Sequence, residues 1–205
     1  MTENPGVEPH DDLVLNAVLD LAKTCESEYE HVTHVSFLAL RIFDDLKSLH
    51  GLDAADRFIL QCASILHDIG WIEGWRSHHK IALRIILETP MLPFSHRERL
   101  LIGSIARYHR KALPNTSHDH FAALNLEDRK TVQMLSGFLR LADGLDRSHA
   151  RRIKDVKCSI KKGFICIDCF SDSLAKEEQE GGIKKADLLS LMLDREIQIK
   201  IKTTN

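Results

Sequence analysis

The sequence predicts a mainly α-helical protein that ends in a small α+β segment. Apolar residues recur every three or four positions through most of residues 11–150, which is the spacing of amphipathic helices. Beyond Ser148 the apolar residues alternate instead, which is typical of strands. We therefore expect a helical domain over residues 11–150, with a small β/α appendage packed on it over residues 151–205.

Capping residues and stop signals divide the helical part into elements. Asp11 and Asp12 can cap the first helix, and Ser95 with Glu98 forms a capping box for the fifth. Residues 1–10 are polar and contain Pro and Gly, so we expect a disordered leader there. The predicted helices cover about residues 11–26, 28–49, 53–70, 77–89, 95–113 and 126–145, with a polar loop at 115–120.

The C-terminal segment reads as a βαβ-like unit. Two alternating runs at residues 156–160 and 164–170 flank the turn Lys161-Lys162-Gly163 and predict a hairpin. An acidic loop is expected at 177–182, a short helix at 184–193, and a third strand at 196–202. A free edge on that third strand, through Ile197–Ile201, would allow a homodimer.

Charge and composition exclude several classes of protein. The 205 residues contain 28 Lys and Arg against 30 Asp and Glu, so bulk capture of nucleic acid or an anionic membrane is not expected. No apolar run approaches the roughly 20 residues of a membrane-spanning helix, and the N-terminus does not resemble a secretory signal. Five cysteines are an odd number, which favours a reduced, cytoplasmic protein.

The strongest local signal for chemistry is the dipeptide His67-Asp68, which ends an apolar helix. Two polar groups in such a position are costly to bury unless something pairs with them, and a divalent cation would do so. A helix C-terminus with a favourable His is the alternative interpretation.

Two other helices present polar residues toward the expected core. His31 continues an apolar stripe through Val35, while His34 lies about 60° away from that stripe and is the second choice. In the helix at 126–145, Asp143 and Asp146 could each reach the interior.

Together these residues carry a family resemblance. The order His31, His67-Asp68, Asp143 on successive helices resembles the HD superfamily of metal-dependent phosphohydrolases. Three strings more specifically resemble the C-terminal HD-like domain of the Ppx/GppA exopolyphosphatase/guanosine pentaphosphatase family: LHDIG at 66–70, IARYHRK at 105–111 and LRLADGLDRSH at 139–149. The likeness extends from about Glu28 to the end of the chain, although Ile81-Ala82 departs from the family's His-Ser.

The resemblance implies an HD-type helical bundle and a set of metal ligands. One ion would be held by His31, His67, Asp68 and Asp143, and a second by His78 and His109, with His79 as the alternative to His78. Asp68 would bridge the pair as the catalytic carboxylate. One or two ions of Mn, Mg, Fe, Co or Zn suit such ligands, and would generate a hydroxide that attacks a phosphoryl group.

The expected partner is an anionic phosphorylated small molecule. Lys80, Arg110 and Arg147 are the preferred phosphate-binding candidates, because they adjoin the implied ligands in sequence. Trp71 and Trp75 could stack on a base, but packing at a helix junction is favoured.

The sequence is compatible with two main hypotheses for the function and with a third, less favoured one. The first is a phosphohydrolase acting on a nucleotide, phosphomonoester or phosphoanhydride. The second is a non-catalytic module that binds polyphosphate or a guanosine alarmone, since the family's actin-like phosphatase module is expected to be missing. The third is a di-iron oxygenase, a chemistry that the HD superfamily also includes.

Overall fold

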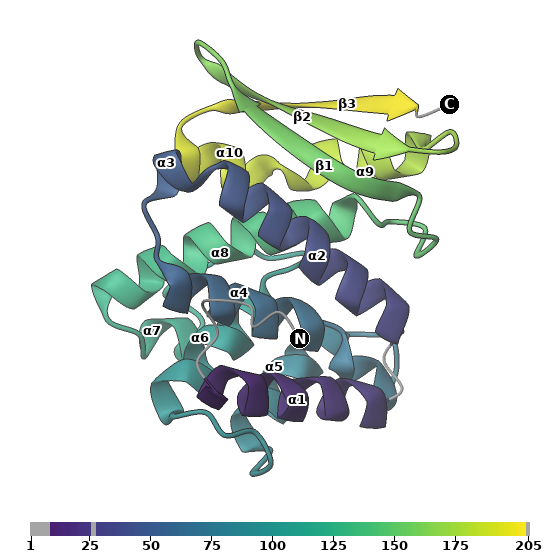
Figure 1. Ribbon diagram of the computed structural model, residues 1–205. Coiled ribbons are helices and arrows are strands. Elements are labelled where there is room, and N and C mark those ends of the chain that lie inside the picture. The colour runs from purple at the N-terminus through teal and green to yellow at the C-terminus, as the bar shows by residue number, and fades with distance from the viewer. Residues whose placement is uncertain (1–8, 26–27, 204–205) are drawn as a thin grey trace.

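A computed structural model describes residues 9–25 and 28–203 of the chain (Figure 1). Most of the expected leader lies outside the described residues, and the first helix already begins at Pro9. The helical part consists of α1 (Pro9–Thr24), α2 (Tyr29–Asp45), α3 (Lys47–His50), α4 (Ala54–Leu66), the 3-10 helix η1 (Ile69–Glu73), α5 (His78–Glu88), α6 (His96–Arg107), α7 (Asp119–Ala122) and α8 (Leu126–Gly144).

A three-stranded sheet follows the helices. Strands β1 (Ile153–Ile160) and β2 (Phe164–Ser171) pair antiparallel, and β3 (Glu196–Thr203) pairs parallel with β2. The parallel pairing requires a crossover, which α9 (Lys176–Lys185) and α10 (Asp187–Leu193) provide. The mainly helical class with a small C-terminal sheet is thereby confirmed.

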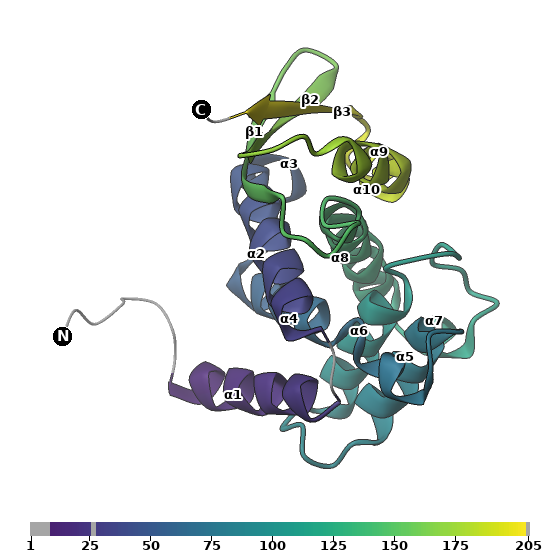
Figure 2. The same cartoon turned by 90° about the vertical axis from the view of Figure 1, so that its right-hand side faces the viewer.

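The elements stack in layers around a single apolar core. Figures 1 and 2 show the sheet at one end, then α9 and α10, then α2 and α8, with α4 to α6 below them and α1 at the far end. The predicted stripe of α2 is fully buried at Val35, Leu38 and Ile42. Among the described residues, none of the helices combines the length and apolar character needed to cross a bilayer.

Two helices end earlier than the sequence predicted. α4 stops at Leu66 and continues as η1, and this tighter turn lets Gly70 press against α5. A Cβ at Gly70 would lie only 2.0 Å from the carbonyl oxygen of His78. α6 stops at Arg107, and the carbonyl of the next residue, Tyr108, accepts a hydrogen bond from Arg140 of α8. Both early ends leave histidines just beyond a helix.

The acidic segment at 177–182 is helical, so the prediction of a loop there is wrong. The reason is a contact between backbones: a Cβ on Gly144 would lie 2.6 Å from the oxygen of Gly181, and one on Gly181 would lie 2.3 Å from the oxygen of Gly144. Only glycine permits helices to approach so closely, and α9 packs directly on α8. Tertiary packing therefore stabilises a helix that has little apolar surface of its own.

Candidate metal centre

Six buried side chains from five helices meet in the middle of the helical layer. His31 lies in the first turn of α2, His78 is the first residue of α5, and Asp143 lies in the last turn of α8. His67 and Asp68 directly follow α4, and His109 follows α6 by two residues. These are the six residues that the resemblance implied as ligands.

Asp68 lies at the centre of this group. Its Oδ1 is 3.1 Å from Nε2 of His78 and 3.6 Å from Nε2 of His109. Its Oδ2 is 3.4 Å from Nε2 of His67 and 3.8 Å from Nε2 of His31. One carboxylate thus faces four imidazoles, which is the placement needed by a ligand shared between two ions.

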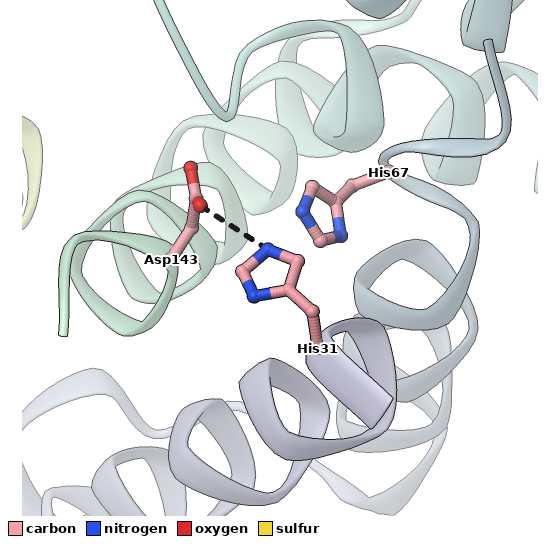
Figure 3. A group of neighbouring side chains, drawn as sticks. All are labelled: His31, His67 and Asp143. Carbon is pink, nitrogen blue, oxygen red and sulfur yellow. Dashed lines mark ion pairs between the residues drawn. The ribbon is translucent and has the colours of Figure 1, made fainter. Parts of the chain in front are cut away.

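Asp143 completes the group from the opposite helix. Figure 3 shows its carboxylate directed at the ring of His31, with His67 beside them, and Oδ1 of Asp143 is 3.7 Å from Nε2 of His31. The potential ligand atoms of His31, His67 and Asp143 lie within 4.8 Å of one another, as do those of His67, Asp68 and His109. Two overlapping groups therefore have dimensions that a metal ion could bridge.

Backbone carbonyls fix the orientation of three of the rings. Nδ1 of His67, His78 and His109 lies 2.6, 3.0 and 2.7 Å, respectively, from the carbonyl oxygen three residues earlier. Because a carbonyl only accepts, each Nδ1 carries a hydrogen, and in the neutral ring Nε2 then presents its lone pair to the group. This partner arrangement is typical of metal-bound histidines.

The inward-facing atoms are therefore nearly all acceptors. The Nε2 atoms of His78 and His109 are 3.3 Å apart, and those of His31 and His67 are buried with no hydrogen-bond partner. Lone pairs at such distances repel one another unless a cation lies between them. Neutral imidazoles and carboxylates without thiolates suit Mn, Fe, Co, Zn or Mg, so the residues fit a divalent ion.

Asp146 and Lys185 hold the ligand candidates from behind. Asp146 Oδ2 accepts from Nδ1 of His31 at 2.8 Å, and its Oδ1 accepts from the backbone N–H of Arg151 at 2.8 Å. Lys185 of α9 forms an ion pair with Oδ2 of Asp143 and leaves Oδ1 facing His31. Of the two acids considered from the sequence, Asp143 thus faces the group and Asp146 orients His31.

The two alternative histidines have other surroundings. The ring of His34 lies 6.1 Å from that of Phe37, and the chain places it half-buried near β1. The buried ring of His79 is 6.3 Å from the ring of His109, and no hydrogen bond joins it to the group.

The electrostatic balance keeps four of the six ligand candidates deprotonated. Burial alone would raise the pKa of Asp68 and of Asp143. The nearby histidines, His67 first, outweigh burial for Asp68, and Lys185 with the histidines outweighs it for Asp143. The pKa of each carboxyl therefore lies below its usual range. Burial lowers the pKa of His67 and His109. Asp68, Asp143, His67 and His109 are therefore in the deprotonated forms that bind metal at neutral pH. For His31, burial is outweighed by the hydrogen bond to Asp146 and by the nearby carboxylates, and its pKa is raised.

A cavity of about 870 Å³ opens above this group, between the helical body and α9. Asp68, His78, His109 and Asp143 form part of its lining. Its basic residues are Arg110, Lys111, Arg140, Arg147, Lys184 and Lys185, and its further acids are Glu177, Glu180 and Asp187. Such a volume suits a small ligand, and the cations favour an anionic one.

Comparison with known families identifies the chain. Residues 15–189 match the family described as Ppx/GppA phosphatase, domain III. The chain belongs to this family. The match spans all six residues of the group and extends through α9, so in this Ppx/GppA domain III chain it covers β1, β2 and α9 of the appendage but ends before β3. No curated protein matches the chain significantly. The sequence-based resemblance to the Ppx/GppA C-terminal domain is confirmed, while membership of the wider HD superfamily stays a prediction.

The three predicted phosphate-binding residues are placed differently. Arg110 and Arg147 line the cavity, and Nη1 of Arg110 is 3.2 Å from Nε2 of His78. Lys80 is exposed on α5 and is not among the residues that line this cavity.

The sequence analysis did not single out Lys184 and Lys185, because it placed them at the start of a short helix instead of at the end of α9. Glu177 and Glu178 in the first turn of α9, with lysines in its last turn, match the helix dipole and could have indicated this helix.

His149 was also missed as part of this region. Its ring stacks on that of His31 with centroids 3.7 Å apart and an interplanar angle of 4°. Its φ is +56°, and Glu28 forms an ion pair with its Nδ1. A left-handed backbone at a non-glycine residue is uncommon, so the loop after α8 holds this ring in place at some cost.

The two tryptophans do not form a packing plug. Trp71 is 41% exposed and Trp75 is 63% exposed, which contradicts the favoured expectation of packing at a helix junction. Trp71 lines the cavity and stacks on His78 with ring centroids 5.2 Å apart. One aromatic face is thus used to hold a ligand candidate.

Proposed function

We propose that this Ppx/GppA domain III chain is a metal-dependent phosphohydrolase of the HD superfamily that acts on a phosphorylated small molecule. The observation that carries the proposal is the convergence of imidazole nitrogens and carboxylates at the floor of a cavity that Arg110, Arg147 and Lys184 also line. A structural scaffold has no need for buried imidazoles, such as those of His31 and His67, whose inward nitrogens have no hydrogen-bond partner.

The residues divide into two ligand sets. His31, His67, Asp68 and Asp143 would hold one divalent ion, and His78 and His109 would hold a second with Asp68 shared. When bound, such ions supply Lewis acidity at a phosphoryl group and lower the pKa of water. Mn, Mg, Fe, Co and Zn all remain compatible with these ligands.

The protein's own residues would bind and orient the substrate. Arg110 lies against His78, at the edge of the ligand group, so its guanidinium is placed to hold a phosphoryl oxygen beside the reacting centre. Arg147 and Lys184 are exposed on the cavity lining and would bind outer phosphate groups. The appendage thereby contributes to substrate recognition through α9.

The experiment combines metal analysis with an activity screen. We expect purified protein to contain, or take up, one or two Mn or Co ions and to hydrolyse a generic phosphoester. His67→Ala and Asp68→Ala should each abolish the activity. His50→Ala is the matched control, because it removes a partly buried imidazole bonded to the carbonyl of Phe43, remote from the cavity. Activity that survives both ligand substitutions would overturn the proposal.

The second candidate is a non-catalytic module that binds polyphosphate or a guanosine alarmone. It is favoured by the family relation and by the number of cations around the cavity. Calorimetry with both polyanions separates the candidates: metal-independent binding without turnover favours the module. Binding that requires metal and is followed by hydrolysis favours the enzyme.

A further inference from the structure

A second, smaller cavity reaches the candidate metal centre from the side of η1. It has a volume of about 300 Å³, and its lining includes Asp68, Trp71, Ile72, Cys25 and Glu28. Asp68 and Trp71 also line the larger cavity, whereas the other three residues do not. The carboxylate at the centre of the ligand group therefore lies at the border of two compartments, and a ligand held at Asp68 can extend into both.

The two compartments differ in charge. Six of the residues that line the larger cavity are basic and five are acidic, whereas none of the described residues that line the small cavity is basic. The charged groups among these residues are the carboxylates of Asp68 and Glu28, and Glu28 is ion-paired with His149. Only the larger cavity thus offers cations to phosphate groups, and the carboxylates of the small one repel them. The small cavity is suited to an uncharged group.

Apolar side chains of the small cavity are open to solvent. Trp71 is 41% exposed and Ile72 is 55% exposed, and both belong to η1, which begins directly after Asp68. Large apolar side chains that are exposed together in a cavity typically mark a binding site. A volume of about 300 Å³ is at the lower end of the range for small-molecule sites, which suits one part of a ligand and not the whole of it.

The indole of Trp71 is held in a fixed place at the border of the two cavities. It stacks on His78 with ring centroids 5.2 Å apart and an interplanar angle of 24°. The backbone of η1 is fixed by the close approach of Gly70 to the carbonyl oxygen of His78. Aromatic rings pack well against other flat rings. A flat group that stacks on Trp71 would therefore lie next to a phosphoryl group held at Asp68.

We propose that the small cavity binds the flat, uncharged organic group of the substrate, such as a nucleobase, while the phosphate groups occupy the larger cavity. The inference rests on the proposed function, because the hydrolysis places the phosphoryl group at Asp68. It narrows the substrate class from phosphorylated small molecules in general to phosphate esters of a nucleoside or a comparable aromatic alcohol. Inorganic polyphosphate has no such group and would leave the small cavity unused.

The test measures binding of two ligands that cannot be hydrolysed, adenosine and inorganic phosphate, to the protein as purified. In calorimetry, Trp71→Ala should weaken adenosine binding about tenfold, because base stacking is lost, and should leave phosphate binding unchanged. Trp71→Phe keeps an aromatic ring and should retain most of the adenosine affinity. Trp75→Ala is the matched control: Trp75 is 63% exposed and is not among the residues that line either cavity, so both ligands should bind as to wild type.

Ile72→Asp tests the same cavity with Trp71 left in place. The added carboxylate makes the cavity less apolar, so adenosine should bind several-fold more weakly. The inference would be overturned if wild type did not bind adenosine, if both substitutions left its affinity unchanged, or if Trp75→Ala weakened it as much as Trp71→Ala. Since no turnover is measured, an inactive protein that shows the expected pattern would overturn the proposed hydrolysis alone.

Discussion

Two regions of the cavity differ in how their residues are held: the floor, which is the group of six ligand candidates, and the rim, which consists of Arg147 and Lys184. On the floor, each ring is buried, and a backbone carbonyl or a carboxylate fixes its tautomer. On the rim, Arg147 and Lys184 are exposed. The floor is thus preorganised for one chemistry, whereas the rim can adapt to the anion that enters. Substitutions should separate the two regions: floor changes should alter metal affinity and rate, and rim changes should alter substrate affinity.

The largest effect after loss of a ligand is expected from Asp146→Ala. This change removes the acceptor that orients His31, and loss of such a partner lowers metal affinity about 10–100-fold. Metal titration measures it. Asp44→Ala, which removes an exposed carboxylate paired with Arg57, is the control and should leave metal affinity unchanged. Equal affinities for all three proteins would show that the floor is not preorganised through Asp146.

The packing of α9, which carries Lys184 of the rim, against α8 can be disrupted at Gly181. An added Cβ there would meet the oxygen of Gly144 at 2.3 Å, so Gly181→Ala should destabilise the protein by about 1–3 kcal/mol. Because α9 would shift, KM for substrate should rise while metal affinity changes little. Urea unfolding and steady-state kinetics measure the two effects. The control is Gly163→Ala in the β1–β2 turn, where a Cβ meets nothing but φ is +88°: it should lower stability without changing KM.

The pH dependence of stability should report the buried histidines, of which the floor supplies two. Burial also lowers the pKa of His34, His50, His79 and His120, which lie outside the floor. The pKa of His67 and His109 is lowered in the folded state, so the unfolded chain binds more protons below about pH 6.5. Stability of the metal-free protein should therefore fall from pH 7 to pH 5, by up to ~1.4 kcal/mol per pH unit for each such histidine. His31, whose pKa is raised, has the opposite sign: its contribution is present below about pH 6.5 and is lost as the pH rises.

Urea unfolding at several pH values measures this slope. Lys184→Ala should leave it unchanged, because that residue belongs to the rim. A stability that does not change between pH 7 and pH 5 would contradict the burial of neutral imidazoles in the protein.

The smallest effects are expected from single rim charges. Lys184→Ala should raise KM a few-fold with kcat unchanged, since one exposed charge contributes about 0–1 kcal/mol to an interaction. Lys80→Ala, which removes an exposed charge outside the cavity lining, should have a smaller effect still. A larger effect at Lys80 than at Lys184 would place substrate over α5 rather than under α9.

The sequence was informative where function depends on local spacing. His31 could be assigned to the core from the apolar stripe of its own helix, and His67-Asp68 from its position at a helix end. The role of α9 depends on Gly144 and Gly181, which are far apart in the sequence and meet only in the fold. Helix ends were uncertain for the same reason: α6 stops where Arg140 of α8 binds the carbonyl of Tyr108. Local patterns and the family resemblance thus indicated the ligand candidates but not the helix that covers them.

The three histidines held by backbone carbonyls, His67, His78 and His109, each follow or begin a different helix. Ions bound by these histidines and Asp68 would therefore link α4, α5 and α6, which otherwise contact one another through apolar side chains. Any sliding of one segment would stretch coordination bonds, which tolerate little extension. Removal of the ions should therefore destabilise α4, α5 and α6 together. Amide hydrogen exchange should then become faster in all three helices at once and not in one helix at a time.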